Sequence, residues 1–201
     1  MRKLIAPFIA CFCALFLVQA TAHAQQIDVA FSGGTLTAPA ATTNNTTITE
    51  SLRGGFYPAF SGDVLFYHHL GVGAEVAWRG SQNYYRPDAY STTLPYRPVL
   101  FDFDAVYAPS LPFHLIQPQL QAGIGVEDVR FYCASCGNYY QTYSTVKHFM
   151  GHFGVGLKFY AFGNFFIRPE ADVYLVHNNV EFSSLYATRV GIAIGYTLGS
   201  H

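Results

Sequence analysis

The stretch at residues 184–199 alternates between two kinds of side chain with period two. One face of an extended strand here would carry Tyr186, Thr188, Val190, Ile192, Ile194, Tyr196 and Leu198, and the other Ala187, Arg189, Gly191, Ala193, Gly195 and Thr197. The first face is apolar with a tyrosine near each end, whereas the second is small or charged. A soluble sheet rarely buries Gly, Ala and Arg on its hidden face. The pattern is typical of a strand with its apolar face toward lipid and its polar face toward a barrel interior.

The same alternation recurs in seven earlier segments. They are approximately residues 26–36, 52–66, 72–82, 99–107, 116–130, 148–159 and 167–175. Their connections run long, short, long, short, long, short and moderately long. In outer-membrane barrels the long connections lie outside the cell and the short ones face the periplasm. The alternation therefore predicts eight strands, with both chain ends on the periplasmic side.

The expected fold class is all-β, an eight-stranded antiparallel up-and-down transmembrane β-barrel. After residue 24, no segment approaches the ~18 consecutive apolar residues that a membrane-spanning helix needs. A chain that crosses lipid without such helices must satisfy its backbone hydrogen bonds in a closed barrel. Strand one is therefore expected to pair with strand eight.

The amino-terminal residues have the three parts of a secretory signal peptide. Arg2 and Lys3 precede a short apolar run, and Ala24 ends an Ala-x-Ala site. We expect residues 1–24 to be removed, with cleavage between Ala24 and Gln25, after export through the Sec pathway. Residues 25–201 then form the barrel domain, in the outer membrane of a Gram-negative bacterium.

Composition is compatible with one aromatic-rich domain. Of the 201 residues, 51% are hydrophobic, 17% aromatic and only 11% charged. The formal net charge of −1 offers no basic surface for nucleic acid. Nucleic acid is therefore not an expected partner.

The inward positions of the expected barrel hold many charged residues. They are Asp63, Glu75, Arg79, Asp102, Asp104, Glu127, Lys158, Arg168, Glu170, Asp172 and Arg189. Side chains fill the interior of an eight-stranded barrel, so these charges must be paired or hydrated. We expect a structural network of ion pairs and water. A path for protons or ions is the alternative, and the excess of carboxylates over bases is its only support.

Cys133 and Cys136 are the cysteine pair left after signal removal. In an oxidising compartment they are expected to form a loop disulfide. Their spacing also suits a zinc knuckle or a redox site, but no second cysteine pair follows. The sequence therefore predicts no metal site and no cofactor.

Arg189, Gly191, Ile194 and Tyr196 follow the order polar-x-Gly-x-x-apolar-x-apolar. This resembles the assembly signal in the final strand of outer-membrane barrels. With its architecture, the mature chain resembles the small OmpA-type outer-membrane β-barrel family. The resemblance implies that the partners are outer-membrane lipid, lipopolysaccharide and the β-barrel assembly machinery, and that the protein is a monomer. The chain departs from that pattern because Thr-Leu-Gly-Ser-His follows Tyr196, where the family usually ends on an aromatic residue.

Some small barrels are lipid A-modifying hydrolases that use Ser and His near the outer leaflet. His148, His177, Ser183 and Ser184 fall near the expected outer rim. His148 is assigned inward and His177 outward, so they should not meet across strands. No segment matches a deacylase motif. We therefore expect no catalytic residues and a non-enzymatic barrel that anchors surface-exposed loops in a structural, adhesive or interaction role. A narrow solute or ion channel is the alternative, and a lipid A-modifying hydrolase is a weaker one.

Overall fold

The computed structural model describes residues 26–39, 42–43, 48–49, 51–67, 69–85, 93–111, 115–132, 142–178, 182 and 185–199. The strands in this part of the chain are β1 (Gln26–Thr37), β2 (Thr42–Thr43), β3 (Ile48–Thr49), β4 (Phe56–Tyr67), β5 (Leu70–Trp78), β6 (Asn83–Tyr85), β7 (Leu94–Tyr107), β8 (Ile116–Tyr132), β9 (Thr142–Phe162), β10 (Phe165–Val176) and β11 (Tyr186–Gly199). No helix within these ranges is both long and apolar enough to span a bilayer. The expected signal peptide and its Ala24–Gln25 cleavage site lie outside the described residues, as do Cys133 and Cys136.

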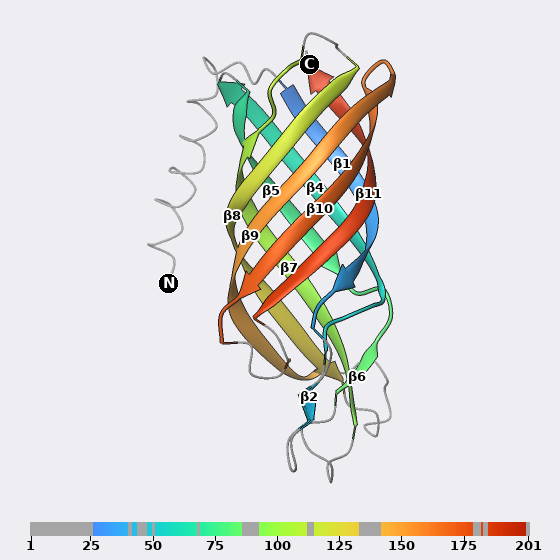
Figure 1. Ribbon diagram of the computed structural model, residues 1–201, viewed down its shortest axis with the longest axis vertical. Coiled ribbons are helices and arrows are strands. Elements are labelled where there is room, and N and C mark those ends of the chain that lie inside the picture. Colours follow the sequence, from blue (N-terminus) through green and yellow to red (C-terminus); the bar gives the residue numbers. More distant parts are fainter. Residues whose placement is uncertain are drawn as a thin grey trace, which may run out of the picture.

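The strands close into an antiparallel barrel (Figure 1). The order around the barrel is β1, β4, β5, β7, β8, β9, β10 and β11, and β11 returns to β1. The closing ladder runs without a break from Gln26 opposite Gly199 to Thr37 opposite Thr188. Each of these eight strands therefore has a partner on both sides, so its backbone groups need no water. The predicted fold class, including the pairing of the first and last barrel strands, is confirmed.

Side chains alternate between the interior and an apolar outer surface as the sequence predicts. The outward side chains include Phe103, which is 72% exposed, and Ile194, which is 64% exposed. Other exposed large apolar side chains are Phe31, Phe60, Val72, Leu120, Phe153, Val155, Val173, Val190 and Ile192. They belong to every strand of the barrel. A contiguous exposed apolar surface of this kind marks contact with lipid or a partner.

The long connections contain short strands that the alternation does not reveal. In the long connection between β1 and β4, β2 pairs with β3. In the next long connection, β6 pairs with the beginning of β7. β2 and β6 lie at the lower end of the barrel in Figure 1, whereas β1 begins and β11 ends at the upper end. The connections after β1 and β5 are longer than the turns after β4 and β9, whereas those after β7 and β8 are similar in length.

The hairpin of β8 and β9 is longer than predicted. β9 begins at Thr142 rather than near residue 148, and β8 continues to Tyr132. The ladder passes through Val129 opposite Val146, and Val129 is buried. β-Branched residues pack well on a pleated surface, so pairing continues past the last apolar outward position. A strand of 21 residues also exceeds the roughly 9–11 that cross a membrane, so β9 extends beyond the apolar belt.

Apolar side chains close the interior toward both ends. A cluster near the long connections includes Tyr57, Tyr96, Phe131 and Phe182. Two smaller clusters lie toward the other end, one with Tyr160 and Phe166 and the other made of Leu65, Val106 and Ala108. The buried charges lie between and beside these clusters. The barrel interior is therefore a packed core with a polar middle section.

The outer surface predicts that the cost of a charge depends on its position. Replacing Ile192, near the middle of β11, with Arg should reduce the free energy of unfolding by ~2–4 kcal/mol, because the guanidinium would face the bilayer midplane. The same change at Leu198, near the end of β11, should cost about 0–1 kcal/mol. Urea titrations of folding into lipid vesicles measure both values. Equal losses at the two positions would contradict the placement of the membrane around the strands.

Candidate functional site in the barrel interior

The structure brings all eleven predicted interior charges into the buried lumen. Ten of them come from seven of the barrel strands, and the eleventh, Arg79, follows β5. Two further ionisable residues, Asp28 on β1 and His152 on β9, join them. Both face inward by the same alternation, but neither was included in the predicted network. His152 was missed because a single inward His carries no signal of its own.

Arg189 lies at the centre of the network. Its Nη2 lies 2.6 Å from Glu75, 3.0 Å from Glu170 and 2.9 Å from Asp172, and its side chain is fully buried. Nη1 donates a hydrogen bond of 3.1 Å to Ser32. Because β1 and β4 separate β11 from β5, the contact with Glu75 crosses the lumen. One guanidinium therefore joins nearly opposite walls.

Arg168 forms a second contact across the lumen. Its Nη2 lies 2.9 Å from Glu170, and its Nη1 lies 3.5 Å from Asp63 on β4. Nη1 also donates to the side-chain oxygen of Gln119 at 3.1 Å. Glu170 therefore lies between the two guanidinium groups of Arg168 and Arg189. The two arginine clusters form one continuous network.

A polar layer lies toward the end with the short turns. The ammonium of Lys158 on β9 pairs with the carboxylate of Asp28 on β1. Thr197 donates a hydrogen bond of 2.6 Å to the same carboxylate. Gln117 and Tyr160 extend this layer, with the Tyr160 hydroxyl donating to Gln117 at 3.0 Å. The layer therefore joins β1, β8, β9 and β11 across the interior.

Three carboxylates lie around the imidazole ring of His152. Its Nδ1 lies 2.9 Å from Asp104 and 3.8 Å from Asp102, and its Nε2 lies 3.4 Å from Asp172. The ring stacks on Tyr174 at a centroid distance of 5.0 Å. Ligand atoms of Asp102, Asp104 and His152 all lie within 4.8 Å of one another. These three residues could hold a metal ion, which their places in the sequence did not indicate.

Arg79 and Glu127 are buried nearer the long connections. Nε and Nη1 of Arg79 have no hydrogen-bond partner within the described ranges. Glu127 lies opposite His148 on β9. Burial of both residues agrees with their inward assignment.

The two histidines considered for hydrolysis lie apart in the structure. His148 is buried on β9, whereas His177 is exposed in the turn after β10. The backbone N–H of His177 donates to the carbonyl of Phe149 at 2.8 Å. Ser183 and Ser184 lie outside the described residues. The two histidines therefore face opposite ways, as their parity indicates.

The four residues of the expected assembly signal have separate environments in β11. Arg189 faces the lumen, whereas Ile194 and Tyr196 face outward. A Cβ on Gly191 would lie 2.9 Å from the carbonyl oxygen of Gly33 on β1, so a larger residue would strain the closing ladder. The Tyr196 ring packs edge-on against Phe165 at 4.8 Å. The signal thus coincides with the place where the barrel closes.

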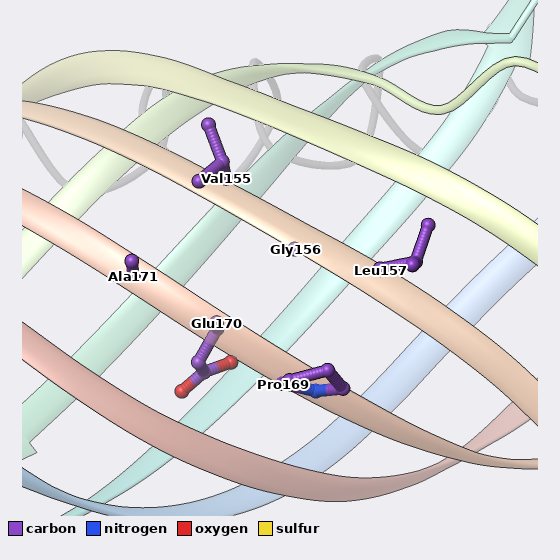
Figure 2. A pocket seen from close by; sticks show the side chains of 6 residues that line it. All are labelled: Val155, Gly156, Leu157, Pro169, Glu170 and Ala171. Carbon is purple, nitrogen blue, oxygen red and sulfur yellow. The ribbon is translucent and has the colours of Figure 1, made fainter.

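A hollow of 370 Å³ lies at the boundary of β9 and β10. Figure 2 shows its lining, in which Gly156 without a side chain lies between Val155 and Leu157, with Pro169 on the neighbouring strand. The ladder keeps its offset on both sides of Pro169, although no pair forms at the proline itself. The hollow is open because Gly156 has no side chain, and the pair at Pro169 is absent because proline has no N–H to donate. Its lining is mainly apolar.

No protein-family model matches the chain, and no curated protein matches it significantly. Solved structures are similar over most of its length. Neisserial surface protein A has a TM-score of 0.59 at 8% identity, covering 85% of this chain and 95% of that one. The N-terminal β-barrel domain of Pseudomonas aeruginosa OprF has a TM-score of 0.55 at 14% identity, covering 87% and 98%. A major outer membrane protein from Thermus thermophilus has a TM-score of 0.53 at 11% identity, covering 88% and 100%.

These likenesses show a shared fold. The chain has the eight-stranded barrel architecture found in outer-membrane proteins. The same architecture supports unrelated tasks, so the task must be argued from the residues of this chain.

The central arginine predicts a large stability effect. Replacing Arg189 with Met should reduce the free energy of unfolding by roughly 3–5 kcal/mol, because three buried carboxylates would lose their shared cation. Arg130 provides the control, since its pair with Asp128 is partly exposed, at 3.0 Å. Its replacement with Met should cost about 0–1 kcal/mol. Denaturant titration of both variants measures the difference, and similar small losses would mean that the network does not hold the walls together.

Proposed function

We propose that this protein is a non-enzymatic, sealed outer-membrane barrel of the small OmpA type. Its task is to hold surface-exposed connections in a structural, adhesive or interaction role. The observation that carries the proposal is the pairing of buried charges across the lumen beneath a continuous apolar outer surface. The interior side chains therefore serve to stabilise the fold. Contact with other molecules is then made by the long connections between strands.

Outer-membrane placement is supported by the arrangement of the two faces. Apolar side chains such as Phe103 and Ile194 face outward, whereas Arg168 and Arg189 are buried inside. In water the apolar outer face of the sheet would be exposed to solvent, whereas in a membrane lipid covers that face. The protein would reach this site by Sec export and removal of residues 1–24, and would contact lipid and lipopolysaccharide there as a monomer.

The sealed state is supported by how the lumen is filled. Tyr57, Tyr96 and Tyr174 are fully buried in the interior. Ion pairs from Arg168 and Arg189 also cross the lumen. A narrow channel would require these contacts to open together, with loss of several buried ion pairs. The packed interior therefore favours an anchor over a conducting protein.

A non-enzymatic role is supported by the positions of the rim histidines. His148 is buried on β9, and His177 is exposed in the turn after β10. A nucleophile and its base must lie within hydrogen-bond reach, about 2.6–3.2 Å. The histidines that suggested lipid A hydrolysis do not provide a shared site.

Conductance measurements test the sealed barrel. Folded protein inserted into planar bilayers should give no stable current steps at moderate voltage, because the network and the aromatic layers fill the lumen. The double variant Arg189→Ala and Glu75→Ala, which removes a contact between nearly opposite walls, is the comparison and should conduct more readily. Steps from the unaltered protein that increase in number with the protein added would overturn the sealed-anchor proposal in favour of a channel.

The final strand should determine assembly. Tyr196→Asp should leave the protein exported and processed but stranded in the periplasm, because the assembly machinery would lose an outward aromatic of its signal. Tyr186→Asp, on the same face of β11 but outside the signal, is the matched control and should assemble more efficiently. Pulse-chase fractionation measures both. Arrival of the Tyr196→Asp protein in the outer membrane at the normal rate and yield would exclude this stretch as the signal.

A further inference from the structure

Asp104 and His152 meet across a glycine inside the barrel. Gly123 on β8 lies between them, opposite Asp104 on β7 and opposite His152 on β9. A Cβ on Gly123 would collide with the Oδ1 atom of Asp104. The missing side chain therefore allows a carboxylate and an imidazole two strands apart to come within 2.9 Å.

Asp102 adds a buried carboxylate that accepts no hydrogen bond within the described part of the chain. Its side chain has no exposed surface, and neither oxygen accepts a hydrogen bond from any described residue. Oδ1 points to the same centre, 3.8 Å from Nδ1 of His152. A buried charge without hydrogen bonds is strongly unfavourable, and coordination to a metal is one of the ways in which proteins compensate it. This carboxylate is an indication of a missing cation that is independent of the Asp104–His152 contact.

The charge balance of the interior points in the same direction. Within the described part of the chain, the buried carboxylates are Asp28, Asp63, Glu75, Asp102, Asp104, Glu127, Asp128, Glu170 and Asp172, and the buried Lys and Arg side chains are Arg79, Lys158, Arg168 and Arg189. Asp128 is neutralised by the partly exposed Arg130. Carboxylates still outnumber these cations two to one. At the centre near His152, Arg189 contacts Asp172, but no described Lys or Arg pairs with Asp102 or Asp104.

The second nitrogen of His152 is arranged as in protein metal sites. Nε2 lies 3.4 Å from Asp172, which Arg189 holds at 2.9 Å. With the proton on Nε2 donated to Asp172, the lone pair of Nδ1 points at Asp102 and Asp104. Metal-bound histidines commonly donate their other N–H to a carboxylate in this way. Tyr174 stacks on the ring and fixes its orientation.

We propose that Asp102, Asp104 and His152 bind one divalent transition-metal ion, such as Zn²⁺ or Mn²⁺, inside the barrel. One imidazole nitrogen and two carboxylates suit these ions. Two ligands that each lie about 2.1 Å from Zn²⁺ can be at most about 4.2 Å apart. The distances of 2.9 Å and 3.8 Å from Nδ1 to the two carboxylates satisfy this limit. The ion would tie β7 to β9 and supply the positive charge that the centre lacks.

Metal content and unfolding temperature test the site together. The full-length protein, made without a histidine tag and folded in detergent, is stripped with a chelator, incubated with Zn²⁺ or Mn²⁺ and desalted. Elemental analysis should find one ion per chain, and saturating metal should raise the midpoint of thermal unfolding. Asp102→Asn should lose at least 80% of the bound metal and the thermal shift.

The variants are chosen so that loss of folding is not mistaken for loss of binding. Asp102→Asn removes a carboxylate that makes no hydrogen bond with the described residues, so it should fold with unchanged heat-dependent gel mobility. Asp128→Asn is the same substitution at a buried carboxylate outside the cluster and should keep the metal. Asp104→Asn provides a second variant of the site.

Two results would overturn the metal site. One is less than 0.2 ion per chain in the unaltered protein, which would leave a proton shared by Asp102 and Asp104 as the means of charge compensation. The other is equal metal content in the unaltered protein, Asp102→Asn and Asp104→Asn, which would assign binding to other histidines. Neither result bears on the anchoring role proposed above, which conductance and fractionation test separately.

Discussion

Burial of the Arg189 guanidinium is the interaction on which the rest of the interior depends. Closing eight strands brings all inward side chains into a space too narrow for bulk water. A charge in that space must find its opposite on another strand, because desolvation of each ion costs several kcal/mol. Arg189 meets this requirement by contacting Glu75, Glu170 and Asp172 together. Pairing of charges and closure of the sheet are therefore linked.

The same constraint explains why the barrel is layered. Aromatic clusters near both ends separate the charged middle from water, which strengthens the contacts between Arg168, Glu170 and their partners. The fold is therefore sensitive to substitution of these residues, because removing one partner leaves the other charge unpaired and without water. Asp102 is one place where a buried charge accepts no hydrogen bond from the described side chains, and there the geometry favours a bound cation.

Alternation along the chain was sufficient to predict the fold and the direction of nearly every barrel side chain. Period two separates Ile192 and Ile194 from Arg189 and Gly191 with no knowledge of partners. It could not predict which charges meet, because contacts across the lumen depend on the offset between strands accumulated around the barrel. The approach of His152 to Asp104 depends on the registers of two ladders and on Gly123 between them. The strand pairing of β6, and of the part of the β8–β9 hairpin that was not predicted, lies beyond the apolar outer surface. Lipid does not contact these residues, so their sequence need not alternate between apolar and polar side chains.

A double-mutant cycle between Arg189 and Glu75 is the most direct test of the central claim that paired charges hold the walls together. Arg189→Met, Glu75→Gln and the double variant are unfolded in urea beside the unaltered protein, and the coupling energy is taken from the four free energies. Contact at 2.6 Å across the lumen predicts a favourable coupling above about 1 kcal/mol. Effects that add to within about 0.5 kcal/mol would contradict the account, because residues that do not interact add in this way.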